Sequence, residues 1–366
     1  MKSEIKFLTE YVGTPSPSGY EMELGGQKVW IDYVKQFCDK VEVDNYGNAY
    51  AYYNSVKHST YGEGVGYIKN ENVKTVLLDA HGDEIGFYVF DITKEGFIKI
   101  GCIGGSDITI APSSRVDIWG EKGAVTGVFG HPAIHVHNRK FEAKVEEMFL
   151  DIGVSTKEEV EEKGITIGTP ITMVDGYMDL GDYHCGRSLD DKIGGFINSQ
   201  ILRKLHKNKV SLPFELVVVN AVQEEVGLYG AQMAAKRINP DVAIAIDVTH
   251  DTDSPAYDKK KQGSISAGKG VVLMNAPSIQ KNLLKLLVNT AKENKIPYQL
   301  TASGRGSGTN ADAYAYPHGI PTALVKMGMR YMHTTVETVH KKDVQCAIDL
   351  LYATLNKKEI IESFKY

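Results

Sequence analysis

The pattern of apolar and polar positions divides the 366-residue chain into three parts. In the first and last parts, continuous apolar runs such as VLLDA and VVVNAV alternate with segments whose apolar residues recur every three or four positions. Short continuous apolar runs are typical of strands buried on both faces, and the longer period is typical of amphipathic helices. Strands that alternate with helices predict a mostly parallel sheet that helices cover on both faces.

The individual elements follow from these runs. The buried strands that we expect cover residues 73–78, 214–222, 241–247, 298–302 and 321–327. The helices that we expect cover residues 21–37, 191–208, 228–237, 277–295 and 341–358, after an amphipathic helix at the N-terminus that a Pro/Gly/Ser turn closes. The residues VEVDNYGNAYAYY predict two short strands around a glycine turn.

The middle part, residues 90–178, has a different pattern. Short segments such as GFIKIGCI, SRVDIWG and GAVTGVFG alternate between apolar and polar residues, and glycine turns separate them. A period of two is typical of half-buried strands in a small barrel or sandwich. We therefore expect a zinc-peptidase-like α/β domain, formed by residues 1–89 and 179–366, with a small β-barrel domain of residues 90–178 inserted in it.

Composition narrows the class of protein. Apolar residues make up 42% of the chain, and the net charge is −5, which disfavours a nucleic-acid binder with a basic stripe. No stretch approaches the roughly 18 apolar residues of a membrane span, and the N-terminus does not resemble a signal peptide. The four cysteines lack metal-knuckle spacing, so a reducing, cytoplasmic location fits best.

Acidic residues and histidines follow several of the predicted strands. In open α/β sheets, ligands bind beyond the carboxyl ends of the strands. The residues in question are His81, Asp83, Glu224, Glu225, Asp247 and His333, and the pair Asp190 and Asp191 opens a predicted helix. Each has an ordinary explanation alone: His81 as a core histidine, Asp190 as a helix N-cap. Their coincidence at one edge of one sheet predicts a site.

The chemistry of this set points to metal ions. Buried carboxylates cannot all stay ionised without a cation. Imidazoles together with carboxylates suit Zn²⁺ or Co²⁺, with Mn²⁺ possible. Two ions suit the set best, because one carboxylate can bridge them while another, which binds neither ion, acts as a general base. Asp83 lies two residues after His81, so it can accept the second imidazole N–H and fix the tautomer.

Several segments, in this order, resemble the M42 metallo-aminopeptidases: AHGDEIGF, GRSLDDKIGG and QEEVGLYGA, followed by IAIDVTH and RYMHTTVE. The resemblance covers essentially the whole chain. It implies that His81 and Asp247 bind one metal, that Glu225 and His333 bind the other, and that Asp190 bridges them. It further implies that Glu224 is the general base and that the Asp190–Asp191 peptide bond is cis. We count Asp83 with Glu224 as a catalytic residue, because it can fix the tautomer of His81.

The resemblance also implies an activity and an assembly. The expected function is a two-metal aminopeptidase that acts on peptide substrates, in which a metal-bridging hydroxide attacks the scissile carbonyl and Glu224 transfers the proton. The inserted barrel is similar to the family's dimerisation domain. We therefore expect a homo-oligomer built from dimers, and the family includes dodecamers.

Three departures from the family pattern concern the surroundings of the metal set. Lys192 stands where the family usually has arginine, and Thr334 and Thr335 stand where it often has Ser-Pro. The run GSGTNADAYAY is longer than the common Gly-Thr-Asp-Ala run, which leaves open whether Asn310 or Asp312 matches its aspartate. These changes put the substrate pocket, and not the metal set, in doubt.

Other functions use similar residues. A two-metal carboxypeptidase or amide deacylase would need the same metal set, and a carboxypeptidase would also need a cation for the terminal carboxylate. Arg187, Arg305 and Arg330 lie near the motifs, so the sequence leaves this alternative open. A glycoside hydrolase would leave the histidines without a role. A metal-binding protein without catalysis would not need Glu224.

Overall fold

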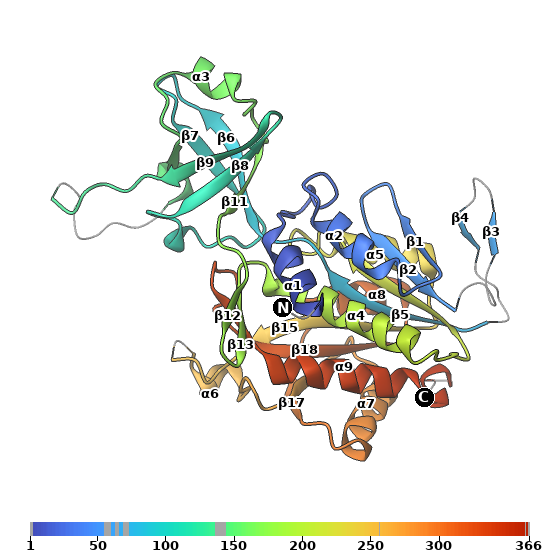
Figure 1. Ribbon diagram of the computed structural model, residues 1–366. Helices are drawn as coiled ribbons and strands as arrows, with labels where there is room; N and C mark the ends of the chain where they lie inside the picture. The colour runs from blue at the N-terminus through green and yellow to red at the C-terminus, as the bar shows by residue number, and fades with distance from the viewer. Residues whose placement is uncertain are drawn as a thin grey trace.

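The chain consists of an α/β unit and a β-barrel that projects from it (Figure 1). The structure is a computed structural model that describes residues 3–54, 60–62, 66–68, 73–135, 144–255, 257–362 and 364. The helices of the α/β unit are α1 (Ser3–Gly13), α2 (Gly26–Val34), α4 (Leu189–Lys207), α5 (Tyr229–Ile238), α6 (Lys259–Gln262), α7 (Lys281–Glu293), α8 (Asn310–His318) and α9 (Lys341–Leu355). None of the helices in these ranges is long and apolar enough to cross a membrane.

The α/β unit is built on one large sheet. Its strands are β1 (Lys40–Val43), β2 (Ala49–Tyr53), β5 (Thr75–His81), β12 (Met178–Leu180), β13 (Tyr183–Gly186), β14 (Glu215–Ala221), β15 (Val242–His250), β16 (Val271–Asn275), β17 (Tyr298–Ala302), β18 (Thr322–Arg330) and β19 (Glu337–His340). A separate hairpin joins β3 (Thr60–Gly62) to β4 (Gly66–Ile68). The main strand order is β1-β2-β14-β5-β15-β18-β19-β13-β12, and β16 pairs with β18 and with β17.

The centre of this sheet is parallel. Strand β5 pairs in parallel with β14 and β15, and β15 pairs in parallel with β18. Consequently the carboxyl ends of these four strands meet at one edge. Antiparallel strands complete both sides, which makes the sheet mixed. These flanking strands include pieces of three or four residues, too short to stand out in the apolar pattern.

Helices cover both faces of the sheet, as the apolar runs predict. Val76 and Leu78 of β5 pack in one core with residues of α1, α2, α4 and α9. Leu77, which points the other way, packs in a second core with residues of α5 and α8. In Figure 1, α4 and α9 lie across the near face. Because consecutive strand residues face opposite sides, both cores require an unbroken apolar run.

The inserted part is a closed barrel of antiparallel strands. Its members are β6 (Gly86–Ile92), β7 (Ile98–Ile103), β8 (Arg115–Gly120), β9 (Gly123–Phe129), β10 (Phe149–Asp151) and β11 (Pro170–Met173), in the order β10-β7-β6-β11-β8-β9. The β10–β9 pairing closes it. Within the charged segment STKEEVEEKG, helix α3 (Lys157–Glu162) begins at a capping box between Thr156 and Glu159. The barrel starts at Gly86, four residues before the boundary expected from alternation.

These elements confirm the predicted fold, an α/β sheet flanked by helices with an inserted barrel. The core of the barrel consists of residues from alternate positions, such as Val116 and Ile118 of β8. Several elements of the α/β unit were not expected: the helices α6 and α8 and the strands β12, β13, β16 and β19. Helix α8 contains Pro317, which disfavours a helix, whereas β16 has the apolar run Val271–Met274, which the sequence analysis did not assign to an element.

Candidate active site

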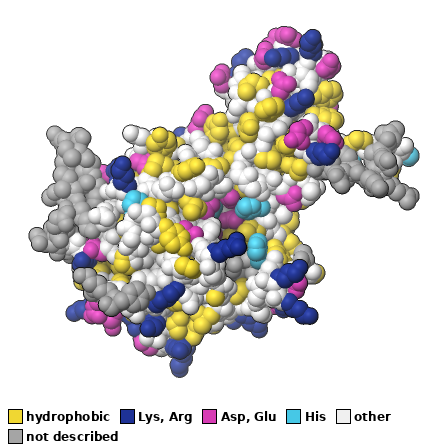
Figure 2. All heavy atoms as spheres, turned by 180° about the vertical axis from the view of Figure 1, so that it is seen from behind, with side chains coloured by type: hydrophobic (Ala, Val, Ile, Leu, Met, Phe, Trp, Pro, Cys, Tyr) yellow, Lys and Arg dark blue, Asp and Glu magenta, His cyan; other side chains and the backbone are white. Residues whose placement is uncertain are grey.

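The predicted site residues meet at the carboxyl edge of the parallel strands. His81 ends β5, and Glu224 and Glu225 follow β14. Asp247 lies in β15, and His333 follows β18. Figure 2 shows acidic and histidine side chains gathered in a hollow in the middle of this face.

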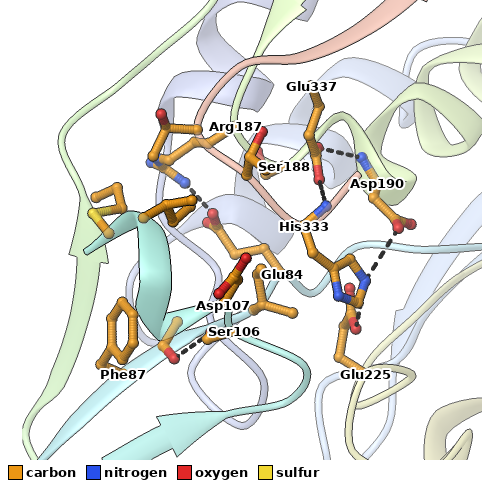
Figure 3. A pocket seen from close by; sticks show the side chains of 16 residues that line it. Glu84, Phe87, Ser106, Asp107, Arg187, Ser188, Asp190, Glu225, His333 and Glu337 are labelled. Atoms are coloured by element: carbon orange, nitrogen blue, oxygen red, sulfur yellow. Dashed lines mark hydrogen bonds and ion pairs between the residues drawn. The ribbon is translucent and has the colours of Figure 1, made fainter. Parts of the chain in front are cut away.

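Asp190 lies between the two imidazoles. One of its carboxylate oxygens is 3.2 Å from Nε2 of His81, and the other is 3.5 Å from Nε2 of His333. Nε2 of His333 is also 3.5 Å from a carboxylate oxygen of Glu225 (Figure 3). Asp190 therefore has the position that a bridging carboxylate needs. Its peptide bond to Asp191 is cis, as the family resemblance implied.

Two overlapping groups of side chains have metal-ligand spacing. One group is His81, Glu224 and Asp247, and the other is His81, Asp190 and Glu225; within each, the potential ligand atoms lie within 4.8 Å of one another. The structure thus brings together every residue that the sequence indicated. These two groups differ from the two expected sets of metal ligands, because they include Glu224 and do not include His333.

The cluster contains more buried carboxylate groups than its two histidines could neutralise. Burial and the charges of Asp247 and Glu225 raise the pKa of Glu224 to about 9. Burial and Asp190 raise the pKa of Asp247 to about 6, an effect that the charge of Lys326 opposes. Burial would raise the pKa of Asp190 too, but hydrogen bonds from His333 and His81 hold it below its usual range.

These properties fit a cation. Oδ2 of Asp191 is buried without a hydrogen-bond partner, and the pKa of this carboxyl is raised, mainly by burial and by Asp247. A buried acceptor without a partner is costly, and divalent cations bind such oxygen and imidazole donors. The residues present therefore fit one or two divalent metal ions.

Asp83 connects His81 to the glutamate pair. Its carboxylate accepts hydrogen bonds from the backbone N–H groups of Glu224 (3.0 Å) and Glu225 (3.2 Å). Oδ1 of Asp83 is 3.4 Å from Nδ1 of His81, and its carbonyl oxygen is 3.2 Å from the same nitrogen. Asp83 thus orients both the imidazole and the turn after β14, whereas sequence reasoning expected only the first.

Gly82 makes this arrangement possible. It stands between His81 and Asp83, where a Cβ atom would lie 2.4 Å from Nδ2 of Asn220. The side chain of Asn220 is buried and bonds to Tyr11 and Gln27, so it has no room to retreat. Only glycine fits between the two site residues.

Glu337 is a buried residue of the site to which the sequence analysis assigned no role. Its carboxylate accepts the backbone N–H of Asp190 and that of His333, each at 2.9 Å (Figure 3). The backbone of His333 has a φ of 61°, in the left-handed region. Glu337 thus holds an unusual turn and joins two site residues. The sequence feature that could have indicated this role is the acidic residue four positions after His333.

The departures from the family pattern have structural explanations. Nζ of Lys192 is 2.6 Å from the carbonyl oxygen of Thr14 and 3.4 Å from Glu84, and the residue is fully buried. Asp312 accepts hydrogen bonds from Ser307 and Gly308, which shapes the loop before α8. Neither Lys192 nor Asp312 lines a cavity at the cluster, whereas Thr334 and Thr335 do.

Two hollows adjoin the cluster and share Asp190, Glu225 and His333. The first, of about 470 Å³, lies against the barrel and has apolar walls that include Phe87, Ile110 and Met173. Figure 3 shows this hollow. The second, of about 810 Å³, opens over His81, Glu224 and Asp247; its walls include Leu228, His250, Thr309 and Lys326. The second hollow is the larger of the two and is therefore the better candidate for binding a peptide.

Comparison with known proteins gives consistent similarities. A sequence profile described as M42 glutamyl aminopeptidase matches residues 62–350. The chain is 30% identical to the lysyl aminopeptidase of Pyrococcus furiosus over 360 residues, which cover 96% of each protein.

Two solved structures are also similar. The TET aminopeptidase of a marine sediment Thaumarchaeota archaeon superposes with a TM-score of 0.87 at 27% identity, over 99% of both chains. The TET1 peptidase of Pyrococcus horikoshii, described as assembling into a tetrahedron or a large octahedral shell, has a TM-score of 0.81 at 28% identity. That match covers 96% of this chain and 98% of the other.

Proposed function

The chain belongs to the M42 family of aminopeptidases, and on that premise we propose that it removes N-terminal residues from peptides with two divalent metal ions. Zn²⁺ and Co²⁺ suit the donor set best, and Mn²⁺ is an alternative. His81 and Asp247 would hold one ion, Glu225 and His333 the other, and Asp190 both. When bound, such ions polarise the scissile carbonyl and lower the pKa of the attacking water.

The observation that carries this proposal is the position of Asp190 between the two imidazoles, with one carboxylate oxygen toward each. A carboxylate held in this way can serve two ions at once. Glu337 supports it, because its carboxylate fixes the backbone of Asp190 and that of His333. The chain itself therefore holds the bridging group in place.

Glu224 is the proposed general base. Its carboxylate oxygen is 3.9 Å from Nε2 of His81, and it lines the open hollow where a peptide would lie. The pKa of Glu224 is raised by burial and by neighbouring carboxylates. Metal ions bound to the neighbouring carboxylates would neutralise their charge. The repulsion would then disappear, and the pKa of Glu224 would fall toward the range in which it can act as a base. Glu224 would take a proton from the attacking water and donate it to the leaving amine.

The arginines near the site favour an enzyme that reads the amino end of the peptide. Arg187 forms a buried ion pair with Glu84, and Arg330 binds Asp251 at 2.7 Å. Arg305 is exposed and lines neither hollow at the cluster. A carboxypeptidase preferably binds the terminal carboxylate with an arginine, but Arg187 and Arg330 already pair with carboxylates of the chain.

A panel of aminoacyl p-nitroanilides, assayed before and after chelation, tests the activity. We expect hydrolysis that chelation abolishes and that Zn²⁺ or Co²⁺ restores. An unblocked dipeptide amide should be cleaved, and its N-acetylated form should not. Faster cleavage of an N-acetylated peptide with a free carboxylate would instead support a carboxypeptidase.

We also propose that the chain forms a homo-oligomer through the barrel. The barrel exposes large apolar side chains: Phe90 is 60% exposed and Ile134 is 77% exposed. Contiguous exposed apolar surface favours an interface, and the TET1 peptidase of Pyrococcus horikoshii, to which the chain is similar, is described as assembling into a tetrahedron or a large octahedral shell. Light scattering should show an assembly that Phe90→Asp reduces in size and that Tyr46→Asp, at an exposed position of the α/β unit, leaves intact. An unchanged mass for both variants would contradict the role of the barrel.

A further inference from the structure

Lys326 is a cation beside the cluster to which the proposed mechanism gives no role. It lies in β18, in register with Asp247 of the neighbouring parallel strand β15. Paired residues of adjacent strands point to the same face of a sheet. Lys326 accordingly lines the same open hollow as Asp247.

The ammonium of Lys326 lacks a direct partner. The residue is 7% exposed, and within the described part of the chain it forms no hydrogen bond and no ion-pair contact, although its charge lowers the pKa of Asp247. Lys192, the other buried lysine near the site, contacts both Thr14 and Glu84. A largely buried ammonium needs a compensating negative charge. The carboxylates of the cluster supply that charge until bound metal ions neutralise them, and in the metal-loaded enzyme an anion that enters the hollow would take their place.

The remaining charges of the hollow indicate which anion fits. Its carboxylates are those of Asp190, Glu224, Glu225 and Asp247, and the proposed function assigns all four to metal binding or proton transfer. Lys326 is then the charged residue of the hollow that remains to contact the substrate. His250, on the same wall, bonds through Nδ1 to the hydroxyl of Tyr257 at 3.2 Å, and burial lowers its pKa, which favours the neutral form.

We propose that Lys326 is a specificity-determining residue that binds a carboxylate group of the peptide substrate. The inference rests on the proposed function, because it assigns a preference to the same site. Two parts of a peptide could supply the carboxylate within reach of the cluster. One is the side chain of an N-terminal Glu or Asp, and the other is the C-terminus of a dipeptide.

The test compares substrate ratios within each enzyme variant, loaded with the same metal, so that a general loss of activity cancels. Glu-, Leu- and Lys-p-nitroanilide carry no C-terminal carboxylate, and Leu-Gly and its amide differ only in that group. We expect the wild-type enzyme to favour Glu- over Lys-p-nitroanilide. Lys326→Met should lower the Glu/Leu ratio of kcat/KM about 10- to 100-fold, the loss expected for a charge-assisted hydrogen bond.

Further variants keep the test decisive. Lys326→Arg should retain most of the Glu/Leu ratio, and Lys326→Gln replaces the Met variant if that one fails to fold. Lys285→Met, on the exposed side of α7, is the matched control and should change no ratio. A fall confined to the ratio of Leu-Gly to its amide would support the proposal with the C-terminus as the source of the carboxylate.

The outcomes separate this inference from the function on which it rests. If aminoacyl substrates are cleaved but neither ratio changes in the Met and Gln variants, Lys326 does not determine specificity, and the aminopeptidase proposal stands. If the metal-loaded wild-type enzyme cleaves none of these substrates, the proposed function fails and the inference fails with it.

Discussion

The carboxyl edge of the parallel strands and the barrel differ in what they bury. At the edge, Asp83 and Asp191 are fully buried, and Glu337 is nearly so. Among the described residues from 86 to 173, which include the barrel strands, the buried polar side chains are those of Thr169 and Thr172. The rest of the barrel core is apolar.

This difference sets how each region responds to substitution. A buried carboxylate depends on particular partners, because removal of one partner leaves the other unsatisfied. Apolar side chains pack without direction, so residues of similar volume can replace one another at modest cost. We therefore expect small chemical changes at the edge to have large effects, and comparable changes in the barrel to have small ones.

The largest effect should come from Glu224→Gln, which keeps the shape of the side chain and removes its basicity. A positioned acid–base group typically contributes about 10² to 10⁴ in rate, so kcat should fall by that factor while the metal content is unchanged. Glu225→Gln removes a proposed ligand and should lower the metal content. Steady-state kinetics and elemental analysis measure both. Equal loss of metal in the two variants would mean that the two roles are interchanged.

Much of the edge could be predicted because its signals are local. His81, Glu224 and Glu225 directly follow apolar runs that mark buried strands, and parallel strands bring their carboxyl ends together. The barrel was predictable for a similar reason, since alternation of period two is visible within each short segment.

The unpredicted features depend on contacts between distant residues. Strand β13 pairs with β19, more than 150 residues later, and neither is long enough to show a period. The role of Glu337 depends on a turn that brings Asp190 and His333 to it. Lys326 was hidden in a strand that reads as apolar, and only the register with Asp247 places it in the hollow.

A smaller effect should come from Glu337→Gln. The amide can still accept a hydrogen bond, but it lacks the charge that strengthens the bonds to the backbone N–H groups of Asp190 and His333. Groups that orient metal ligands typically contribute about 10- to 100-fold in metal affinity or activity. Titration of the metal-free protein with Zn²⁺ measures the loss.

Glu95→Gln is the matched control for this variant, because Glu95 is an exposed carboxylate between β6 and β7 of the barrel. It should leave the metal affinity unchanged. An equal loss of affinity in both variants would show that overall charge, and not the contacts of Glu337, determines binding. Removal of one charged side chain would then have the same effect on metal affinity at the edge as in the barrel.

The smallest effect should come from the core of the barrel, where Ile118→Val removes one methylene group. Ile118 is fully buried in β8, among the apolar residues of the barrel core. Such a substitution typically costs about 0.5 to 1.5 kcal/mol in the free energy of unfolding. Metal affinity and kcat/KM should remain within about twofold of the wild type, because side chains in this core meet no polar partner that must be satisfied. Chemical denaturation and the p-nitroanilide assay on the same preparations measure both quantities. A loss of activity as large as that of Glu337→Gln would show that the barrel positions the catalytic edge through its packing, and the two regions would then have to be treated as one unit.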